Sequence, residues 1–282
     1  MKAEVLCSRL NILDYAEVLK PRETTLLTFI GVMAAVIAGG KEAGELGRII
    51  LVVGLGSAGV NGLTNYLDRE VDARMARTRH RALPSRRIHP PEKVLPLMVG
   101  LVALALVLAW GLHPLAFFAG LLGTGTALVG RKSGVTHLLG GISGAAPVLV
   151  GWLAVNSQLS PGLLVLCLLV LAWVPLHVGS LMLVHREDYL GAGIKIFPLT
   201  WEERDTHRLL LALALLVVIL SGALYFVGPF SQAYLVIATL LGLALVWAAV
   251  QGHRSGAWSL YKLSAYPYLG FLFLALAADA WF

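Results

Sequence analysis

The sequence predicts an all-α, polytopic membrane bundle of about nine transmembrane helices. Of the 282 residues, 58% are hydrophobic and 13% are charged, whereas an average globular chain carries about 25% charged residues. The apolar residues form long uninterrupted runs rather than the periodic stripes of soluble helices. Several runs approach the roughly 20 residues that cross a bilayer as a helix, which is the structure that pairs backbone groups internally within lipid.

Nine apolar runs are the expected transmembrane helices. They lie near 24–40, 48–66, 94–112, 115–130, 136–156, 162–184, 208–228, 232–250 and 263–281. Several are rich in Gly and Ala, which let membrane helices pack closely. The connections alternate between short turns and long charged loops, notably 67–93 and 185–207, so we expect any chemistry at the end with the long loops. No linker divides the chain, and we predict a single transmembrane domain over 1–282.

The distribution of the positive charges indicates on which side of the membrane each connection lies. The formal net charge is +6, and all but two of the 22 Lys and Arg residues lie in the N-terminal segment and in alternate loops. The intervening connections hold only Lys41 and Arg48. This positive-inside pattern predicts a plasma-membrane protein with a cytoplasmic N-terminus and, after nine spans, an outer C-terminus. It also explains the excess of Lys and Arg over Asp and Glu, so no nucleic-acid partner is expected. Two cysteines are too few for a disulfide framework or a zinc cluster.

Four polar residues mark the end of the second run. Asn61, Asn65, Asp68 and Asp72 are spaced by four, three and four, which places them on one face of a helix. Such a face is costly in a bilayer unless it borders a wet or ion-filled space. Two carboxylates one turn apart, with amide oxygens beside them, suit Mg²⁺, which shares its shell with substrate phosphates. The pattern predicts a metal site with these four residues as ligands.

Arginines follow this face directly. Arg77, Arg79 and Arg81 offer planar, permanently charged donors for phosphate oxygens. Acidic residues for a metal beside arginines for phosphate predict a lipid diphosphate site at one membrane face. The alternative is a basic loop next to the membrane with incidental charges at the helix end.

Two later segments repeat the design of an apolar run followed by polar groups. His177 lies within the sixth run, and Asp188, Tyr189 and Lys195 follow that run. A histidine in this position either makes a structural hydrogen bond or contacts an acceptor or a haem iron. Glu187 and Asp188 either add oxygen ligands or form ordinary ion pairs at a helix end. Arg131 and Lys132 precede the fifth run, where they serve as diphosphate contacts or as topology markers.

These segments resemble the UbiA superfamily of intramembrane prenyltransferases and, within it, the protohaem IX farnesyltransferase family. The superfamily motif N-x-x-x-D-x-x-x-D is similar to Asn65-Tyr-Leu-Asp68-Arg-Glu-Val-Asp72, which has two residues between Asn65 and Asp68. Similar stretches, from N- to C-terminus, are YAEVLKPR, DARMARTRHRAL, GGISGAAPVLVGWLAV, WVPLH, EDYLGAGIKIFPL and SAYPYLGFLFLALAAD. The likeness therefore covers nearly the whole chain. Ala82, Thr136 and the stretch IKIFPL depart from the family pattern, and none of them is a metal carboxylate.

The resemblance implies a nine-helix bundle around a central cavity. It also implies a prenyl-transfer reaction. A farnesyl group would pass from farnesyl diphosphate to a vinyl group of haem B, giving haem O, with Mg²⁺ as cofactor at the cytoplasmic face. The product would pass to a haem A synthase or a terminal oxidase assembly. Asn65, Asp68 and Asp72 would be catalytic. The expected diphosphate contacts are Arg77, Arg79, Arg81, Arg131, Lys132 and Lys195, and the expected acceptor contacts are His177, Asp188 and Tyr189.

Two other functions fit parts of the pattern. The first is a UbiA-type prenyltransferase with a quinone precursor or a glycerophosphate lipid as acceptor. The second is an ion-coupled transporter, which would carry its charges near the bilayer midplane on broken, repeat-related helices. The acidic residues here gather at one rim instead, which favours the prenyltransferase.

Overall fold

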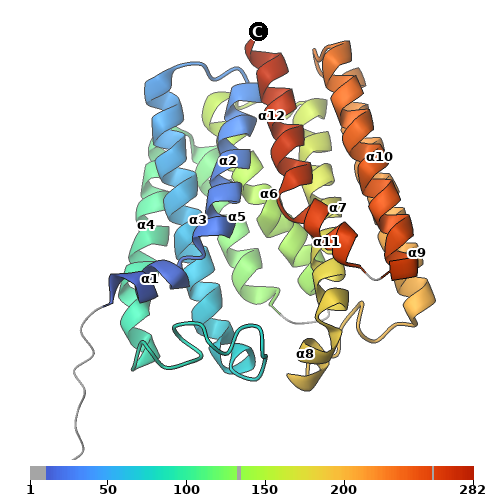
Figure 1. The fold of residues 1–282 in the computed structure, drawn as a ribbon. Helices are drawn as coiled ribbons and strands as arrows, with labels where there is room; N and C mark the ends of the chain where they lie inside the picture. Colours follow the sequence, from blue (N-terminus) through green and yellow to red (C-terminus); the bar gives the residue numbers. More distant parts are fainter. Residues whose placement is uncertain (1–10, 132–134, 256) are drawn as a thin grey trace, which may run out of the picture.

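The computed structural model describes residues 11–131, 135–255 and 257–282. All of its regular elements in these ranges are helical, and Figure 1 shows them as an upright bundle with a few short segments at one end. In chain order they are α1 (Ile12–Val18), α2 (Pro21–Ile37), α3 (Ala43–Asp72), the 3-10 helix η1 (Pro91–Val94), α4 (Leu95–Leu112), α5 (Pro114–Val129), α6 (Thr136–Val155), α7 (Pro161–Val184), α8 (Arg186–Gly191), α9 (Glu203–Val227), α10 (Gln232–Ser255), α11 (Trp258–Ala265) and α12 (Pro267–Trp281).

The predicted all-α membrane fold is confirmed, and the count of nine spans is approximate. By length and composition, seven helical segments in the described ranges can cross a membrane: α3, η1 with α4, α6, α7, α9, α10, and α11 with α12. The helix α5 is apolar but has only 16 residues, and α2 has 17.

Two of the approximate apolar runs differ in detail from the helices that contain them. The run 263–281 is divided, because α11 ends at Ala265 and α12 begins at Pro267. Proline lacks the N–H that would continue the helix, and its ring clashes with the preceding turn. The helix α3 extends beyond the apolar run 48–66 and ends at Asp72, as the predicted Asn/Asp face requires. Hydrophobicity marks only the membrane part of a helix, whereas backbone hydrogen bonding carries α3 beyond it.

The long connections gather at one end of the bundle (Figure 1). We call this the loop end; it carries α1, residues 73–90, α8 and residues 192–202. The opposite end has the short connections at His113, 156–160 and 228–231. Proline occupies the first position of α2, α5, α7 and α12, where its missing N–H has no partner in the helix to lose. These starts and short turns produce the regular up-and-down order.

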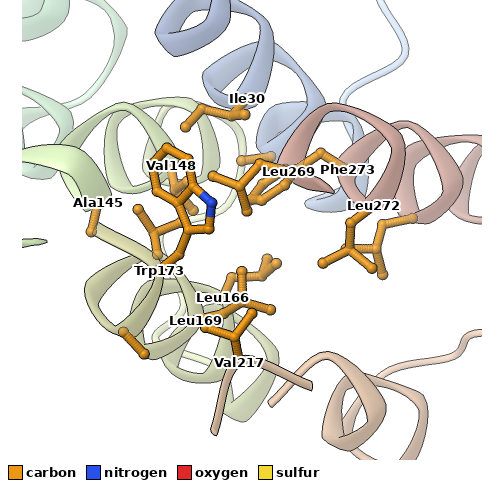
Figure 2. Packing of buried hydrophobic residues seen from close by; sticks show 14 of the residues in the cluster. Ile30, Ala145, Val148, Leu166, Leu169, Trp173, Val217, Leu269, Leu272 and Phe273 are labelled. Atoms are coloured by element: carbon orange, nitrogen blue, oxygen red, sulfur yellow. The ribbon is translucent and has the colours of Figure 1, made fainter. Parts of the chain in front are cut away.

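One half of the bundle is densely packed. Trp173 on α7 lies among Ile30 of α2, Val148 of α6 and Leu269 of α12 (Figure 2). The helices α2 and α6 cross so closely that a Cβ atom on Gly151 would lie 1.8 Å from the carbonyl oxygen of a glycine on α2. Small residues allow this approach in membrane helices. The core formed by α2, α6, α7 and α12 therefore supports the helices that line the cavity described next.

Candidate active site

A cavity of about 430 Å³ lies between α2, α3, α4, α5 and α6. Its walls are mostly apolar and include Val52, Ala105, Leu106, Ala109, Gly120 and Val150. Polar groups line its mouth at the loop end: Lys20, Asn61, Thr64, Arg131 and Thr136. A central cavity was expected; the structure places it within the N-terminal five long helices. An apolar chain fits its interior, with a charged head group at the mouth.

The Asn/Asp face on α3 is present, because all four residues fall within one continuous helix. Asn65 donates from Nδ2 to the carbonyl oxygen of Val18 at 2.7 Å. Asn61 donates from Nδ2 to Thr24 Oγ1 at 2.9 Å, and Thr24 itself donates to the Leu19 carbonyl. A carbonyl can only accept, and a hydroxyl that already donates must accept here. Both amide orientations are therefore defined, and each side-chain carbonyl oxygen remains a possible cation ligand.

The two carboxylates of this face each lie beside an arginine. Asp68 forms an ion pair with Arg131, and Arg131 also donates from Nη1 to the Thr64 carbonyl oxygen at 2.7 Å. Asp72 is 6% exposed and lies 3.5 Å from Arg81. Two of the predicted phosphate contacts are thus brought next to the two predicted metal carboxylates.

The oxygen donors fit Mg²⁺. In the part of the chain that the structure describes, no group of three or more His, Cys, Asp or Glu side chains converges as a metal site. Two carboxylates and two amide oxygens on one helix face are nevertheless hard ligands. Mg²⁺ typically takes only one or two protein carboxylates and completes its shell with waters and substrate phosphates. The face is suited to a metal that arrives with a diphosphate.

Lys20 is a site residue that the sequence interpretation missed. It precedes α2, has a left-handed backbone (φ 49°) and lines the cavity mouth. Burial, followed by the neighbouring positive charge of Arg81, lowers the pKa of Lys20 to about 8, although Asp68 and Asp72 act in the opposite direction. Its place in YAEVLKPR was the available signal, but only the folded turn between α1 and α2 places it at the mouth.

The short helix α8 lies against the loop that follows α3. Asp188 accepts hydrogen bonds from the backbone N–H of Ala76 at 2.5 Å and of Arg77 at 3.1 Å. Tyr189 accepts a hydrogen bond from Arg77 Nη2 at 3.3 Å, and its ring centre is 5.9 Å from the guanidinium carbon. Burial raises the pKa of Tyr189, while the charge of Arg77 opposes the shift. Asp188 and Tyr189, expected on the acceptor side, therefore contact the arginine loop.

His177 is not among the residues that line the cavity, although its neighbour Val178 is. Its ring stacks on Trp173 at 5.1 Å and on Tyr261 at 5.6 Å between centres. Its Nδ1 is 3.4 Å from Ser264 Oγ. The structure therefore places this expected acceptor contact in an aromatic stack between α7 and α11.

The remaining predicted phosphate contacts lie on the surface or outside the described ranges. Arg79 and Lys195 are both exposed. Neither side chain makes a hydrogen bond or ion pair with another residue in the described ranges. Lys132 lies outside the described residues. The contacts that the structure brings to the α3 face are therefore Arg81 and Arg131.

The chain belongs to the UbiA prenyltransferase family, whose model matches residues 25–278. Among curated relatives, the protoheme IX farnesyltransferase of Desulforudis audaxviator is 36% identical over 280 residues, covering 95% of this chain and 88% of that protein. Protoheme IX farnesyltransferase 1 of Picrophilus torridus is 34% identical over 268 residues, 90% of each chain. The predicted prenyltransferase class and the predicted resemblance to protohaem IX farnesyltransferases are confirmed.

Solved structures confirm the fold. A structure of digeranylgeranylglyceryl phosphate synthase matches with a TM-score of 0.77 and 18% identity, over 96% of this chain and 98% of that chain. A UbiA homologue from Archaeoglobus fulgidus bound to GPP and Mg²⁺ matches with a TM-score of 0.70 and 14% identity, over 95% and 99% of the two chains. At this identity the likeness is one of fold. This chain is accordingly a multi-pass membrane protein of the prenyltransferase family.

Proposed function

We propose that this chain transfers a farnesyl group from farnesyl diphosphate to a vinyl group of haem B, forming haem O. The reaction would depend on Mg²⁺ and take place at the cytoplasmic face of the plasma membrane. The observation that carries the proposal is the apolar cavity between α2 and α6, whose mouth holds cations beside the Asn/Asp face. An isoprenoid diphosphate has matching parts, since it joins an apolar tail to an anionic head.

The length of the cavity supports a farnesyl tail. On α3 the lining runs from Thr64 at the mouth to Val52, twelve residues that rise about 18 Å along the helix. On α6 it runs from Thr136 at the mouth to Val150, a rise of about 21 Å. An extended chain of three isoprene units together with its diphosphate has a comparable length. At the far end, Leu106 and Val150 face Gly120, where an added Cβ would lie 3.3 Å and 3.8 Å from their side-chain atoms.

The charged groups at the mouth suit ionisation of an allylic diphosphate. When the C–O bond breaks, the leaving diphosphate takes the electron pair and gains negative charge. Lys20, Arg81 and Arg131 are positioned to stabilise that charge, and preorganised cations act most strongly in such partly buried places. Bound Mg²⁺ would neutralise further phosphate charge. Asp68 and Asp72 would hold the metal, with Asn61 and Asn65 as additional oxygen donors. The arginines would then exchange carboxylate for phosphate partners.

The apolar walls of the cavity would exclude water from the allylic cation. The allylic cation that remains in the cavity reacts with water if water reaches it, and a closed apolar wall prevents that side reaction. The vinyl group of the acceptor supplies the electron pair for the new carbon–carbon bond, and a water molecule then adds to the cation left on the other vinyl carbon and releases a proton, which gives the hydroxylated side chain of haem O. The acceptor is inferred from the relatives named protoheme IX farnesyltransferase, at 34–36% identity. A farnesylated haem stays in the membrane, so we propose direct transfer to a haem A synthase or terminal oxidase assembly.

The test is a reconstituted reaction with matched variants. The purified full chain receives farnesyl diphosphate, haem B and Mg²⁺, and extracted haems are analysed by mass spectrometry. We expect haem O, its loss on chelation of the metal, and its recovery when Mg²⁺ is returned. Asp68→Ala and Asp72→Ala should abolish turnover. Glu70→Gln on the same helix, where the side chain is 77% exposed, should keep it.

Two results would redirect the proposal. Full activity of Asp68→Ala or Asp72→Ala would reject the metal site. Farnesylation of a quinone precursor or a glycerophosphate lipid, with haem B left unchanged, would reject the acceptor while keeping the donor half. The cytoplasmic placement of the loop end and the action of residues 1–282 as one domain are further parts of the proposal. Labelling of a cysteine introduced at Arg79 in intact cells and in inverted vesicles tests the orientation.

A further inference from the structure

The short helix α1 lies across the loop end instead of running parallel to the long helices (Figure 1). It ends at Val18, and two residues later Lys20 lies at the cavity mouth. Val18 is 3% exposed and packs against the loop after α3, in a hydrophobic cluster with Ala82, Leu83 and Ile88. The helix that precedes Lys20 is therefore packed onto the loop that carries the arginines.

Arg87, in the same loop, joins these two elements by charge. Its Nη1 lies 3.2 Å from Asp14 Oδ1, and its Nη2 pairs with the Glu17 carboxylate. We call these three residues the Arg87 clasp. The two carboxylates are three residues apart on α1, so they share one face of that helix. Asp14 is 7% exposed, and a carboxylate buried to this degree is strongly destabilising once its cationic partner is removed.

The clasp connects directly to Lys20. The backbone N–H of Lys20 donates to the carbonyl oxygen of Glu17 at 3.1 Å. The Lys20 backbone is left-handed (φ 49°), a conformation that a residue with a side chain keeps only where the surrounding structure supports it. On the other side of the turn, Thr24 Oγ1 donates to the Leu19 carbonyl oxygen at 2.7 Å. The direction in which the lysine side chain leaves the turn therefore depends on the position of α1.

Lys20 has neighbours of both signs at the mouth. The positive charge of Arg81 and the negative charges of Asp68, Asp72 and Glu23 all act on it. A lysine side chain is a flexible stem that ends in a compact charge. Its reach toward a phosphate is therefore set chiefly by the place at which its backbone is held.

We propose, on the basis of the proposed function, that Arg87 is a positioning residue: it holds α1 against the loop after α3 and so keeps Lys20 at the mouth for the diphosphate. Arg87 is not among the residues that line the cavity, so it acts on the substrate through Lys20. Loss of the clasp lowers the affinity for the donor and leaves that for the acceptor unchanged.

Steady-state kinetics of the purified full chain, with farnesyl diphosphate and haem B varied in turn, provide the test. Arg87→Ala should raise the KM for farnesyl diphosphate about tenfold, because Asp14 is left buried without a partner and α1 must move to hydrate it. Adding Asp14→Asn should return that KM to within about threefold of the wild type, since an amide can stay in place without a cation. The KM for haem B should not change in either variant.

Arg208→Ala is the matched control. Arg208 is an exposed arginine on α9 that pairs with Asp205 at 3.2 Å, so the variant also removes one positive charge and one ion pair. Exposed pairs contribute little, and the donor KM should stay within about twofold of the wild type. A defect as large as that of Arg87→Ala would overturn the inference, because a change of net charge alone would then explain both.

Combination with Lys20→Ala tests the route of the effect. The double variant Lys20→Ala/Arg87→Ala should have the donor KM of Lys20→Ala alone, because the clasp then has no ammonium to position. Defects that multiply would overturn the inference, since Arg87 would then act independently of Lys20. A lower kcat with both KM values unchanged would also overturn it, because that result reports only a smaller folded fraction.

A spin label on α1 measures the clasp directly. The label is attached to a cysteine introduced at Ala16, which is exposed, after replacement of Cys7 and Cys167 by serine. It should become more mobile in Arg87→Ala and less mobile again when Asp14→Asn is added; unchanged mobility would overturn the inference.

Two further comparisons keep the outcome clear. If Arg87→Ala does not fold, Arg87→Lys takes its place, and it should raise the donor KM about threefold because an ammonium lacks the fork that meets both carboxylates. A wild-type chain that does not bind farnesyl diphosphate would reject the proposed function itself. Equal donor affinity in the wild type and the Arg87 variants would reject the inference alone.

Discussion

Arg131 pairs with the Asp68 carboxylate while donating from Nη1 to the backbone carbonyl oxygen of Thr64, 2.7 Å away. These two contacts hold one guanidinium against successive turns of α3 at the cavity mouth. The carbonyl contact does not involve the Asp68 carboxylate. Arg131 can therefore give its remaining N–H groups to a phosphate without losing its place.

Loss of Arg131 should weaken binding of the donor. Arg131→Ala should raise the KM for farnesyl diphosphate about tenfold. Arg131→Lys should recover only part of the affinity, because an ammonium lacks the planar fork that reaches two oxygens. Steady-state kinetics at saturating haem B measures both. Arg79→Ala is the matched control, since Arg79 is exposed and lies outside the cavity; an equal defect in that variant would contradict the geometry of the mouth.

The pKa of Lys20 predicts how donor binding depends on pH. With a pKa lowered to about 8, Lys20 is mostly charged at pH 7 and loses its proton as the pH rises through 8. The attraction for diphosphate is thus present below pH 8 and lost above it. Between pH 7 and 9 the affinity should fall by up to about tenfold. Calorimetric titration of farnesyl diphosphate at each pH is the measurement.

Lys20→Arg provides the comparison, because a guanidinium stays charged over this range. Its affinity profile should be flatter than that of the wild type. Lys41→Ala is the second comparison, since Lys41 lies at the far end of the bundle and donates to the Trp281 carbonyl oxygen. Parallel profiles for the wild type and Lys20→Arg would mean that another group titrates.

The far end of the cavity should set the length of the isoprenoid. Gly120→Leu fills the space that Gly120 leaves between Leu106 and Val150, so it should shift the preference from farnesyl to geranyl diphosphate. Val150→Ala should enlarge that space and raise the relative rate with geranylgeranyl diphosphate. Each shift should be about tenfold, because contact with a few methylene groups is worth that much. Competition among the three diphosphates, read by mass spectrometry, measures it; unchanged ratios in both variants would place the tail elsewhere.

The crossing of α2 and α6 should tolerate no added atom. In Gly151→Ala the new Cβ would lie 1.8 Å from the Gly31 backbone oxygen, so the helices must separate. We expect the free energy of unfolding in detergent to fall by about 1–3 kcal/mol. Gly222→Ala on α9 is the control, because a Cβ there meets nothing within 4 Å, and alanine favours a helix over glycine. A stable Gly151→Ala protein would contradict the close crossing.

The sequence could predict what depends on local periodicity. The Asn/Asp face followed from helical spacing, and the helical order followed from the apolar runs. Hydropathy marks only residues 48–66 of α3, and the spacing of the Asn/Asp face was the signal that the helix reaches Asp72. Lys20, Asp188 and the position of the cavity depend on tertiary contacts. Asp188 meets Ala76 across 112 residues, a separation that no motif spacing reveals.

The hydrogen bond from Asn65 to the Val18 carbonyl oxygen explains why the face on α3 mixes amides with carboxylates. An aspartate at position 65 would be the stronger ligand for a cation. It would also turn a lone pair toward the Val18 carbonyl, and two acceptors repel each other. The amide can perform both tasks, because its nitrogen ties the end of α1 to α3 and its oxygen stays available for the proposed metal. Binding of the proposed metal would therefore act on the same side chain that anchors the end of α1 beside the cavity mouth.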